Sequence, residues 1–538
     1  MNAVAPTQKL PELSPAQVRQ LLLERSELAL IDLREEDPYA QQHPLWAANL
    51  PLSSLELHAW DRIPRRDTVV VLYGTHAGED LVAPAAARLT ALGYSRVHAL
   101  AGGLEAWIAA GYEVFRDVNV PSKAFGEWLE HHRQTPSLPA QEVQALLDNK
   151  ADVVVLDARR FDEYATMNIP GSTSVPGAEL VLRVAALAPD PKTQVIVNCA
   201  GRTRSIVGAQ SLVNAGIPNP VAALRNGTIG WLLAGQALEH GAARRGEAVT
   251  AAGLEQAQQR AQLVAQRAGV KRLPLDQLEL LQDAWRTTYL FDVRTPQEYE
   301  AGHLEGFIGA PGGQLVQETD HSAPVRNARI VLDDSDGVRA PMTASWLAQM
   351  GWEVLLLEGA GPAERIATGP WQRRRPAAPA MPQLNAPALA AMLESAPGQV
   401  QLVDVSPGVR YAAGHIPGAW FVIRGRLAQA LQRVPQAAHY VVTCGDGQLA
   451  PFAAADLKAL LGDAVEVSCL SGGTAAWKAA ALPMETGETR LASARDDRYR
   501  RPYEGTQAPR EAMQAYLDWE FGLVAQLGRD GTHHFNVL

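Results

Sequence analysis

The feature that most constrains this chain is a sequence unit that occurs four times along its 538 residues. Each copy begins with an apolar run that ends in an acidic residue, at Asp32, Asp157, Asp292 and Asp404. Such short apolar runs are typical of buried strands. The copies are spaced by roughly 110 to 135 residues, so each is large enough to be a domain rather than one turn of a solenoid.

Further landmarks recur in the same order within each unit. The second apolar runs lie at 68–73, 194–198, 329–333 and 440–443. A helical pattern and a third apolar run follow, and a Gly-rich turn with a Trp closes three units, at Trp107, Trp231 and Trp477. The third unit lacks this ending. Strands that alternate with helices predict an α/β fold of four tandem domains, each with a mostly parallel sheet and helices on both faces.

The landmarks also predict where the parts of the chain begin and end. The four domains are expected at 1–120, 121–245, 272–375 and 376–490, with a helical linker at 246–271 and a C-terminal tail at 491–538. A helix is predicted in the tail at 509–527, with an apolar face that includes Met513 and Tyr516. We expect this face to dock on a domain or on a second subunit.

Composition narrows the classes of function. The formal net charge of −10 argues against a general binder of nucleic acid or of anionic membranes. The apolar runs are far shorter than a membrane-spanning helix needs, and residues 1–15 do not resemble a secretory signal. Three cysteines cannot form a disulfide framework, which favours the reducing cytoplasm. No His/Cys cluster has the spacing of zinc ligands, and we expect no metal and no cofactor.

The second unit carries the most informative loop. Cys199 ends a β-branched run and precedes a helical pattern. The residues that complete the loop are Ala200, Gly201, Arg202, Thr203, Arg204 and Ser205. Loop amides at a helix start bind anions, and neighbouring Arg residues can lower a Cys pKa from about 8.5 to roughly 3.5–7.5. We therefore expect Cys199 to be the catalytic nucleophile and residues 200–205 to bind the substrate.

The order of these motifs resembles the rhodanese family. The motifs of that family are an Asp-x-Arg strand end followed by His-Ile-Pro-Gly-Ala, a Cys loop, and Gly-Gly-x-x-x-Trp. His-Ile-Pro-Gly-Ala occurs in the fourth unit at 415–419, and Gly-Gly-x-x-x-Trp occurs at 102–107 and 472–477. The plan of four units and a tail is similar to that of the tandem thiosulfate sulfurtransferases of the family. In the second unit Asn168 replaces the motif's His, so we assign no acid–base role there.

The resemblance implies sulfur transfer. Cys199 would attack the outer sulfur of thiosulfate, sulfite would leave, and the Cys199 persulfide would pass its sulfur to cyanide or a thiol. The expected partners are therefore a small sulfur donor and a thiol or cyanide acceptor. Arg204 is the fifth residue after Cys199, whereas the phosphatase relatives use a loop that is one residue longer. Ser205 occupies the corresponding position and has no guanidinium, which favours sulfur transfer over phosphoester hydrolysis.

The other three units differ at the position of the nucleophile. Gly74 stands there in the first unit and Asp334 in the third, so both units are expected to be inactive. Cys444 stands there in the fourth unit and is a second candidate site. Its loop has no Arg, and Asp446 would raise the thiol pKa by charge repulsion. We therefore expect Cys199 to carry most of the activity.

Alternatives remain at this point. Cys199 could relay sulfur from glutathione persulfide or a protein persulfide to a partner, by the same chemistry with another donor. The chain could also be a binding or regulatory array, since three units lack a complete loop. A further alternative is that Cys199 is a buried thiol without any role. A homodimer is a further expectation that the sequence does not decide.

Overall fold

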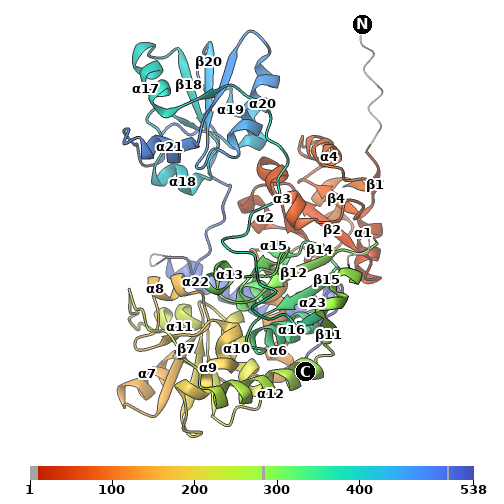
Figure 1. Ribbon diagram of the computed structural model, residues 1–538, viewed down its shortest axis with the longest axis vertical. Coiled ribbons are helices and arrows are strands. Elements are labelled where there is room, and N and C mark those ends of the chain that lie inside the picture. The colour runs from red at the N-terminus through yellow and green to blue at the C-terminus, as the bar shows by residue number, and fades with distance from the viewer. Residues whose placement is uncertain (1–9, 247, 282–284, 506–507) are drawn as a thin grey trace.

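The computed structural model describes residues 10–246, 248–281, 285–505 and 508–538. Four sheets follow one another along the chain (Figure 1), and we call the corresponding units modules 1 to 4. The sheets of modules 2, 3 and 4 each have five parallel strands in equivalent order, such as β6-β10-β9-β7-β8 in module 2. The predicted α/β class with four parallel sheets is confirmed.

The strands are short, as expected for buried parallel sheets. Module 1 contains β1 (Glu12–Leu13), β2 (Leu28–Asp32), β3 (Ala48–Asn49), β4 (Val70–Tyr73) and β5 (Val97–Leu100). Module 2 contains β6 (Ser137–Leu138), β7 (Val153–Asp157), β8 (Thr173–Ser174), β9 (Gln194–Asn198) and β10 (Val221–Leu224). Module 3 contains β11 (Lys271–Pro274), β12 (Thr288–Asp292), β13 (Ile308–Gly309), β14 (Val325–Arg326), β15 (Arg329–Asp333) and β16 (Glu353–Glu358). Module 4 contains β17 (Gln383–Leu384), β18 (Val400–Asp404), β19 (Trp420–Phe421), β20 (His439–Thr443) and β21 (Glu466–Leu470).

Helices connect these strands. Module 1 has α1 (Pro15–Leu23), α2 (Glu36–Gln41), η1 (Leu52–Ser54), α3 (Leu55–Arg62), α4 (Val82–Ala91) and α5 (Gly103–Ala109), and α6 (Val120–Arg133) leads to module 2. Module 2 has α7 (Ala140–Asp148), α8 (Phe161–Thr166), η2 (Gly177–Glu179), α9 (Leu180–Leu187), α10 (Thr203–Asn214) and α11 (Gly227–Leu233). The linker helix is α12 (Ala251–Arg267), and module 3 has η3 (Leu275–Leu281), α13 (Pro296–Ala301), α14 (Gly312–Gln317), α15 (Thr319–Ser322) and α16 (Arg339–Gln349). Module 4 has α17 (Ala386–Ser395), α18 (Gly408–Ala413), η4 (Arg424–Arg426), α19 (Leu427–Ala430), α20 (Ala450–Leu461) and α21 (Gly473–Ala479).

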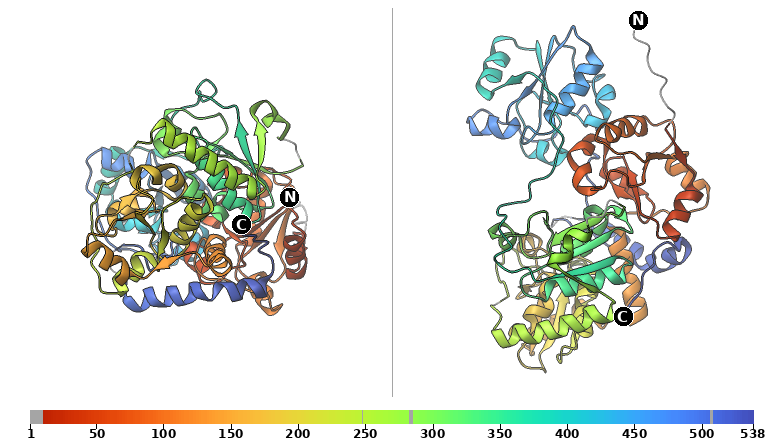
Figure 2. Two further views of the ribbon diagram at one scale, coloured as in Figure 1. Left: turned by 90° about the horizontal axis from the view of Figure 1, so that it is seen from below. Right: turned by 45° about the vertical axis from the view of Figure 1, so that its right-hand side comes forward.

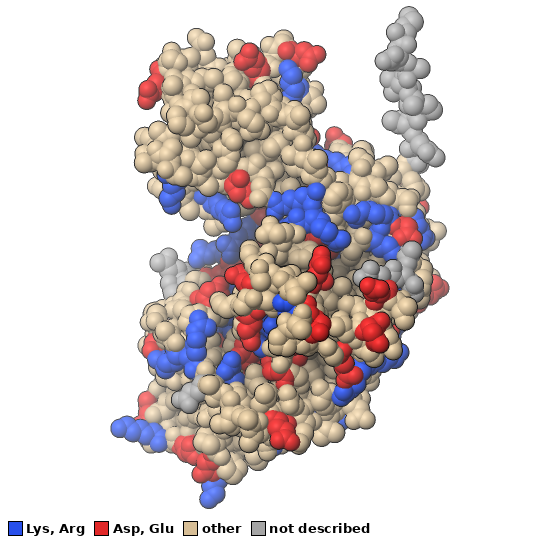
Figure 3. Space-filling view, viewed as in Figure 1, with Lys and Arg blue, Asp and Glu red and all other residues tan. Residues whose placement is uncertain are grey.

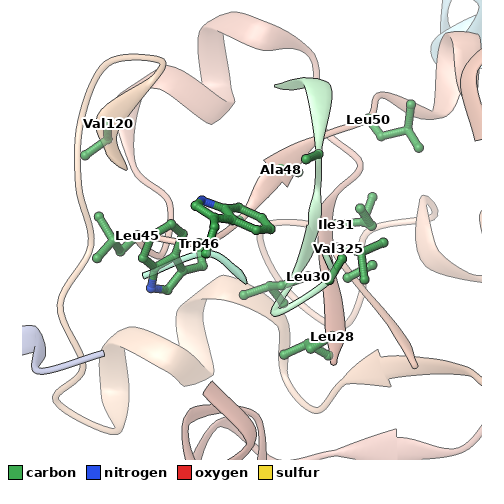
Figure 4. Close-up of a cluster of buried hydrophobic side chains, with 14 of the residues drawn as sticks. Leu28, Leu30, Ile31, Leu45, Trp46, Ala48, Leu50, Val120 and Val325 are labelled. Carbon is green, nitrogen blue, oxygen red and sulfur yellow. The ribbon is translucent and has the colours of Figure 1, made fainter. Parts of the chain in front are cut away.

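Modules 1 and 3 share one hydrophobic core. Strand β14 of module 3 pairs antiparallel with β2 of module 1, and Val325 lies opposite Ala29. Figure 4 shows Val325 among Leu28, Leu30 and Ile31 of β2, all of them buried. Because one apolar cluster contains residues of both modules, the two modules form a single packed body rather than two independently packed domains.

Module 4 stands apart from the other three modules. Its two apolar clusters contain only its own residues and those of its flanking segments. Its contact with module 1 is polar: Arg424 of η4 binds Glu56 of α3, and Asp456 of α20 binds Arg88 of α4. Figure 3 shows basic side chains gathered where this module meets the rest of the molecule. We infer that module 4 is held by ion pairs, whereas modules 1, 2 and 3 are held by apolar packing.

The C-terminal tail differs from the single helix predicted at 509–527. It forms α22 (Arg510–Phe521) and α23 (Leu523–Asp530), which meet at Gly522. Both helices lie along the body formed by modules 1 to 3, where α22 contacts α11 of module 2 and α23 contacts α6 (Figure 2). Of the two docking partners expected from the sequence, the tail helix therefore uses a domain of its own chain. Within the described ranges, no helix is long and apolar enough to span a bilayer.

Candidate active site at Cys199

Cys199 follows β9 directly and lies at the carboxyl edge of the module 2 sheet. Its neighbour strand β7 ends in Asp157, which lies opposite Asn198 and accepts a hydrogen bond from its side chain at 2.8 Å. The carboxyl ends of parallel strands are the usual place for ligands in such sheets. The β-branched residues of β9 are buried in the core, so the fold presents the following loop at the edge.

Backbone hydrogen bonds hold the Cys199 loop against the start of α11. The carbonyl oxygen of Cys199 accepts a hydrogen bond from the backbone N–H of Thr228 at 2.9 Å, and that of Ala200 accepts one from Ile229 at 3.0 Å. Gly227 has φ +55°, and a Cβ there would lie 2.3 Å from the Cys199 carbonyl oxygen. Only glycine permits this approach, so the Gly-rich turn found in the sequence serves to seat the Cys loop.

The sulfur faces the start of α10. Cys199 Sγ lies 3.5 Å from Ser205 Oγ, and Ser205 Oγ donates to the carbonyl oxygen of Arg202 at 2.8 Å. The first N–H groups of a helix have no partner inside it, and α10 begins at Thr203. Thr203 itself packs against Gly126 of α6. The predicted loop residues run from Cys199 into the first turn of α10, and of these Ser205 contacts the sulfur directly.

The two arginines of the loop have different environments. Arg204 donates two hydrogen bonds to the carboxylate of Glu163 on α8, at 2.7 and 2.9 Å, and its charge acts on Cys199. Arg202 donates instead to Glu127 and Glu130 of α6, and its guanidinium carbon lies 4.3 Å from the ring centre of Phe521. Arg204 is thus the cation of the sulfur site, and Arg202 joins the loop to α6 and the tail.

The pKa of Cys199 differs from the sequence-based expectation of a lowered value. The thiol is 2% exposed, and its burial raises the pKa above the ordinary value. Arg204 and Ser205 act in the opposite direction, but the loss of water outweighs them. Arg204 in turn lowers the pKa of Glu163 to about 2 against a raising effect of burial, so this ion pair is charged at neutral pH.

The tail helix covers the loop, which the sequence did not predict. A Cβ on Gly201 would lie 3.2 Å from Tyr516 Cε1 and 3.4 Å from Glu520 Oε2. Tyr516 Oη donates to Glu520 Oε1 at 2.9 Å. The sequence signal was the apolar face of α22, which packs on Ile229 of α11. That face showed that the helix docks, but not that it docks over the Cys199 loop.

A cavity of about 320 Å³ opens beside the loop, between module 2, module 3 and the tail. Arg204 and Glu163 line it from module 2, and Arg501 and Tyr503 line it from the tail. Arg204 lines this cavity, and its charge also acts on Cys199.

The second candidate, Cys444, occupies an equivalent loop in module 4. Its carbonyl oxygen accepts from the N–H of Thr474 at 2.9 Å, as that of Cys199 accepts from Thr228. Its sulfur lies 3.8 Å from Asp446 Oδ1. Burial raises the pKa of Cys444, and Asp446 adds to this effect. The third cysteine, Cys469, is buried in β21, and burial raises its pKa to about 12.

A cation that the sequence analysis missed lies beside the Cys444 loop. A Cβ on Gly445 would be 3.3 Å from an Nη atom of Arg410, which belongs to α18. Arg410 occupies the position in its module that Glu163 occupies in module 2, because each residue directly precedes the equivalent tyrosine, Tyr411 or Tyr164. Module 4 thus carries its positive charge on the helix rather than on the loop.

In modules 1 and 3 a carboxylate of the chain itself fills the loop. Glu79 Oε2 accepts the N–H of Thr75 at 2.5 Å, directly beside Gly74. In module 3, Asp334 accepts the N–H groups of Gly337 at 2.9 Å and Ala340 at 2.7 Å. Both carboxylates occupy the anion-binding amides, so neither loop is open to an anionic donor.

The described part of the chain contains no group of three or more His, Cys, Asp or Glu side chains placed to hold a metal ion. The groups present at Cys199 are a buried thiol, the guanidinium of Arg204 and the amides at the start of α10.

Comparisons with known proteins agree with this architecture. The rhodanese-like domain family matches residues 14–110, 139–234, 274–361 and 385–480. A crystal structure of thiosulfate sulfurtransferase from Pseudomonas aeruginosa is 61% identical, covers 98% of this chain and 100% of that chain, and superposes with a TM-score of 0.96. A rhodanese-like domain protein from Staphylococcus aureus is 26% identical, covers 18% of this chain and 91% of its own, and has a TM-score of 0.16. None of the curated proteins compared with the chain matches it. The four family matches span more than half of the sequence, and the chain belongs to the rhodanese family.

Proposed function

We propose that the protein is a thiosulfate sulfurtransferase whose nucleophile is Cys199. The Pseudomonas aeruginosa protein of that name aligns with nearly the whole chain at 61% identity. The observation that carries the proposal is the coincidence, in one loop, of a thiol with Arg204, whose guanidinium is oriented by Glu163. Modules 1 and 3 lack the thiol, and module 4 lacks the loop arginine.

The geometry supports covalent transfer in two half-reactions. The Cys199 thiolate attacks the outer sulfur of thiosulfate and a Cys–S bond to sulfur forms. The sulfur–sulfur bond of thiosulfate breaks, and sulfite leaves with its electron pair. An acceptor thiolate or cyanide then attacks the outer sulfur of the persulfide and releases Cys199. Arg204 and the amides at the start of α10 stabilise the oxyanions of the donor.

The substrate class follows from the size of the loop. Six residues from Cys199 to Arg204 close around a sulfur, with Ser205 Oγ already 3.5 Å from Cys199 Sγ. The expected activity is thiosulfate-dependent formation of thiocyanate from cyanide, and no hydrolysis of aryl phosphates. Robust phosphatase activity without sulfur transfer would contradict the proposal.

The physiological donor is a finer question. If a low-molecular-weight persulfide is the donor, kcat/KM for glutathione persulfide will exceed that for thiosulfate. The Arg204 cavity supports a small anionic donor such as thiosulfate, and we expect the opposite ranking. Both measurements use the same coupled assay of the released thiol or sulfite.

Cys444 is proposed as a weaker second acceptor. Its loop is held by the same backbone hydrogen bond to the following helix as the loop of Cys199. Arg410 supplies a positive charge next to Gly445. Against it stand Asp446 and a raised thiol pKa. Persulfide formation at Cys444 is therefore expected to be slower than at Cys199.

We also propose a cytoplasmic location, because the three cysteines are unpaired and buried, as in proteins of reducing compartments. Small-molecule sulfur donors and acceptors are the proposed partners. A homodimer stays a prediction, and size-exclusion chromatography with light scattering measures it directly.

A further inference from the structure

The C-terminal helix brings a buried acid to the Cys199 loop. Helix α22 is seated on α11, where Arg510 donates to the carbonyl oxygens of Leu232 and Leu233. At its far end the helix places Glu520 Oε2 against Gly201, two residues after the nucleophile. The side chain of Glu520 is fully buried. A carboxyl group so far from water needs a partner or a function.

Only one of the two carboxylate oxygens of Glu520 has a hydrogen-bond partner among the described residues. Its Oε1 accepts the hydroxyl of Tyr516, but its Oε2 has no hydrogen-bond partner among the described residues. The charged side chains that face it from other elements are committed elsewhere. Lys123 of α6 binds Asp117 at 2.7 Å, and Arg202 of the loop binds Glu127 of α6. Oε2 is thus an acceptor without a hydrogen-bond partner that lies against Gly201 of the Cys loop.

Glu520 holds its proton at neutral pH and loses it slightly above neutral pH. Burial raises its pKa to about 8, and the negative charge of Glu127 adds to this effect. Lys123, Tyr516 and Arg202 act in the opposite direction. The group also interacts with the nucleophile, because the charge of Glu520 raises the pKa of Cys199. A proton on one of the two groups therefore affects its binding to the other.

We propose that Glu520 is the proton carrier of the Cys199 site, taking up the thiol proton when sulfur is loaded and returning it when the sulfur leaves. This proposal rests on the sulfurtransferase function proposed above. It adds a residue that lies 321 positions along the chain from the nucleophile and belongs to none of the four modules.

The proton balance closes over the two half-reactions. In loading, the Glu520 carboxylate accepts the Cys199 proton, the thiolate forms a bond to the outer sulfur of thiosulfate, and sulfite leaves with the bonding pair. The site then holds a persulfide anion and a neutral carboxylic acid. In discharge, the acceptor takes the outer sulfur, and the released Cys199 thiolate regains its proton from Glu520. Thiosulfate and cyanide become sulfite and thiocyanate with no net proton change.

The cycle also keeps the total charge of the buried pair formed by Glu520 and Cys199 constant. In its reactive form, above the pKa of Glu520, the resting pair carries one negative charge on Glu520, and the loaded pair carries one on the persulfide. Burial penalises a second negative charge much more strongly than it penalises moving the first. One internal carrier therefore suits a nucleophile that is 2% exposed, because the proton does not have to cross to water in each half-reaction.

The test is the rate of Cys199 persulfide formation against pH, followed by rapid quenching and mass spectrometry of the full-length protein. The wild-type rate is expected to rise through about pH 8, where Glu520 loses its proton. Glu520→Gln keeps the size of the side chain and its acceptor for Tyr516. We expect it to lose this rise and to load about a hundredfold more slowly at neutral pH.

Three further variants separate the proton role from a structural role. Asp518→Asn changes an exposed carboxylate of the same helix and is expected to keep the wild-type profile. Glu520→Asp restores a titrating group and is expected to restore the rise at a lower rate. Tyr516→Phe removes the hydroxyl donor that favours the carboxylate, and should move the rise to higher pH.

Two outcomes overturn the proposal. One is a Glu520→Gln profile that matches the wild type in position and rate. If that variant is not obtained folded, an unmoved rise in Tyr516→Phe overturns it equally. Failure of the sulfurtransferase function has a different signature, since the wild-type protein would then gain no sulfur on Cys199 at any pH.

Discussion

Modules 2 and 3 hold the same ion pair but differ at the reacting position. Arg204 binds Glu163 at 2.7 and 2.9 Å, and Arg339 binds Glu298 at 2.6 and 2.8 Å in the equivalent place. The scaffold that orients the arginine is therefore common to both modules. What separates them is the side chain that follows the central strand.

We propose that this side chain decides whether the loop binds an external anion. In module 3 the Asp334 carboxylate takes the amides of Gly337 and Ala340, as a bound anion would. Burial and the charge of Asp336 raise its pKa to about 7, which shows how costly a second charge is there. In module 2 the Cys199 thiol is neutral, and of the equivalent amides that of Ser205 donates a hydrogen bond to the sulfur. The comparison indicates that the backbone geometry of the loop suits an anion in both modules. The residue at the position of the nucleophile determines how each loop is used.

The largest expected effect comes from removing the nucleophile of module 2. Cys199→Ser should lower thiosulfate:cyanide activity by more than about a thousandfold, because serine forms no persulfide. Cys444→Ser should leave most of the activity, since Cys444 lacks the loop arginine. A Cys199→Ser protein that keeps most of its activity would assign the reaction to module 4.

A smaller effect is expected from the arginine that both modules share. Arg204→Leu reproduces the residue of module 4, Leu449, and should lower kcat/KM for thiosulfate by about 10- to 100-fold through loss of a charge-assisted contact. The matched control is Arg339→Leu, which breaks the equivalent ion pair in module 3. Steady-state kinetics with both variants separates the two roles, because equal losses of activity would mean that the pair acts only through stability.

Acid pH should affect the shared ion pair in a predictable direction. The pKa of Glu163 is lowered to about 2, below its value of about 4.5 in the unfolded chain. The pair therefore stabilises module 2 fully above about pH 4.5, and the contribution is lost as the pH falls towards 2. Glu163→Gln should lower the urea midpoint at pH 7 and should match the wild type near pH 2. A difference that persists unchanged at pH 2 would contradict this origin of the stability.

The smallest effect concerns Asp446 in module 4. Asp446→Ser removes a negative charge 3.8 Å from Cys444 Sγ and should lower the thiol pKa. We expect Cys444 to react a few times faster with iodoacetamide at pH 8, with Cys199 as the internal reference. An unchanged ratio of the two alkylation rates would mean that burial alone controls Cys444.

Local patterns were sufficient to predict the fold and the place of Cys199 at the end of a buried strand. The repeated strand endings and the Gly-rich turns are local signals, and the turn at Gly227 lies where the Cys loop needs it. The short helix start after Arg202 was also visible in the sequence.

What could not be predicted depends on contacts between distant segments. Arg202 was expected to bind substrate, but Glu127, 75 residues earlier, binds its guanidinium. The cover formed by Tyr516 and Glu520 requires the tail to return to module 2, and no local pattern encodes that path. The same cover explains the direction of the Cys199 pKa, because burial is a property of the assembled fold.

The most direct test of the account is peptide-resolved mass spectrometry of all three cysteines after treatment with thiosulfate. The account predicts a gain of ~32 daltons, the mass of one sulfur, on the Cys199 peptide, with little on Cys444 and none on Cys469. The gain should disappear when cyanide is added. No gain on Cys199 would contradict sulfur transfer and favour a binding array, and a gain mainly on Cys444 would place the reaction in module 4.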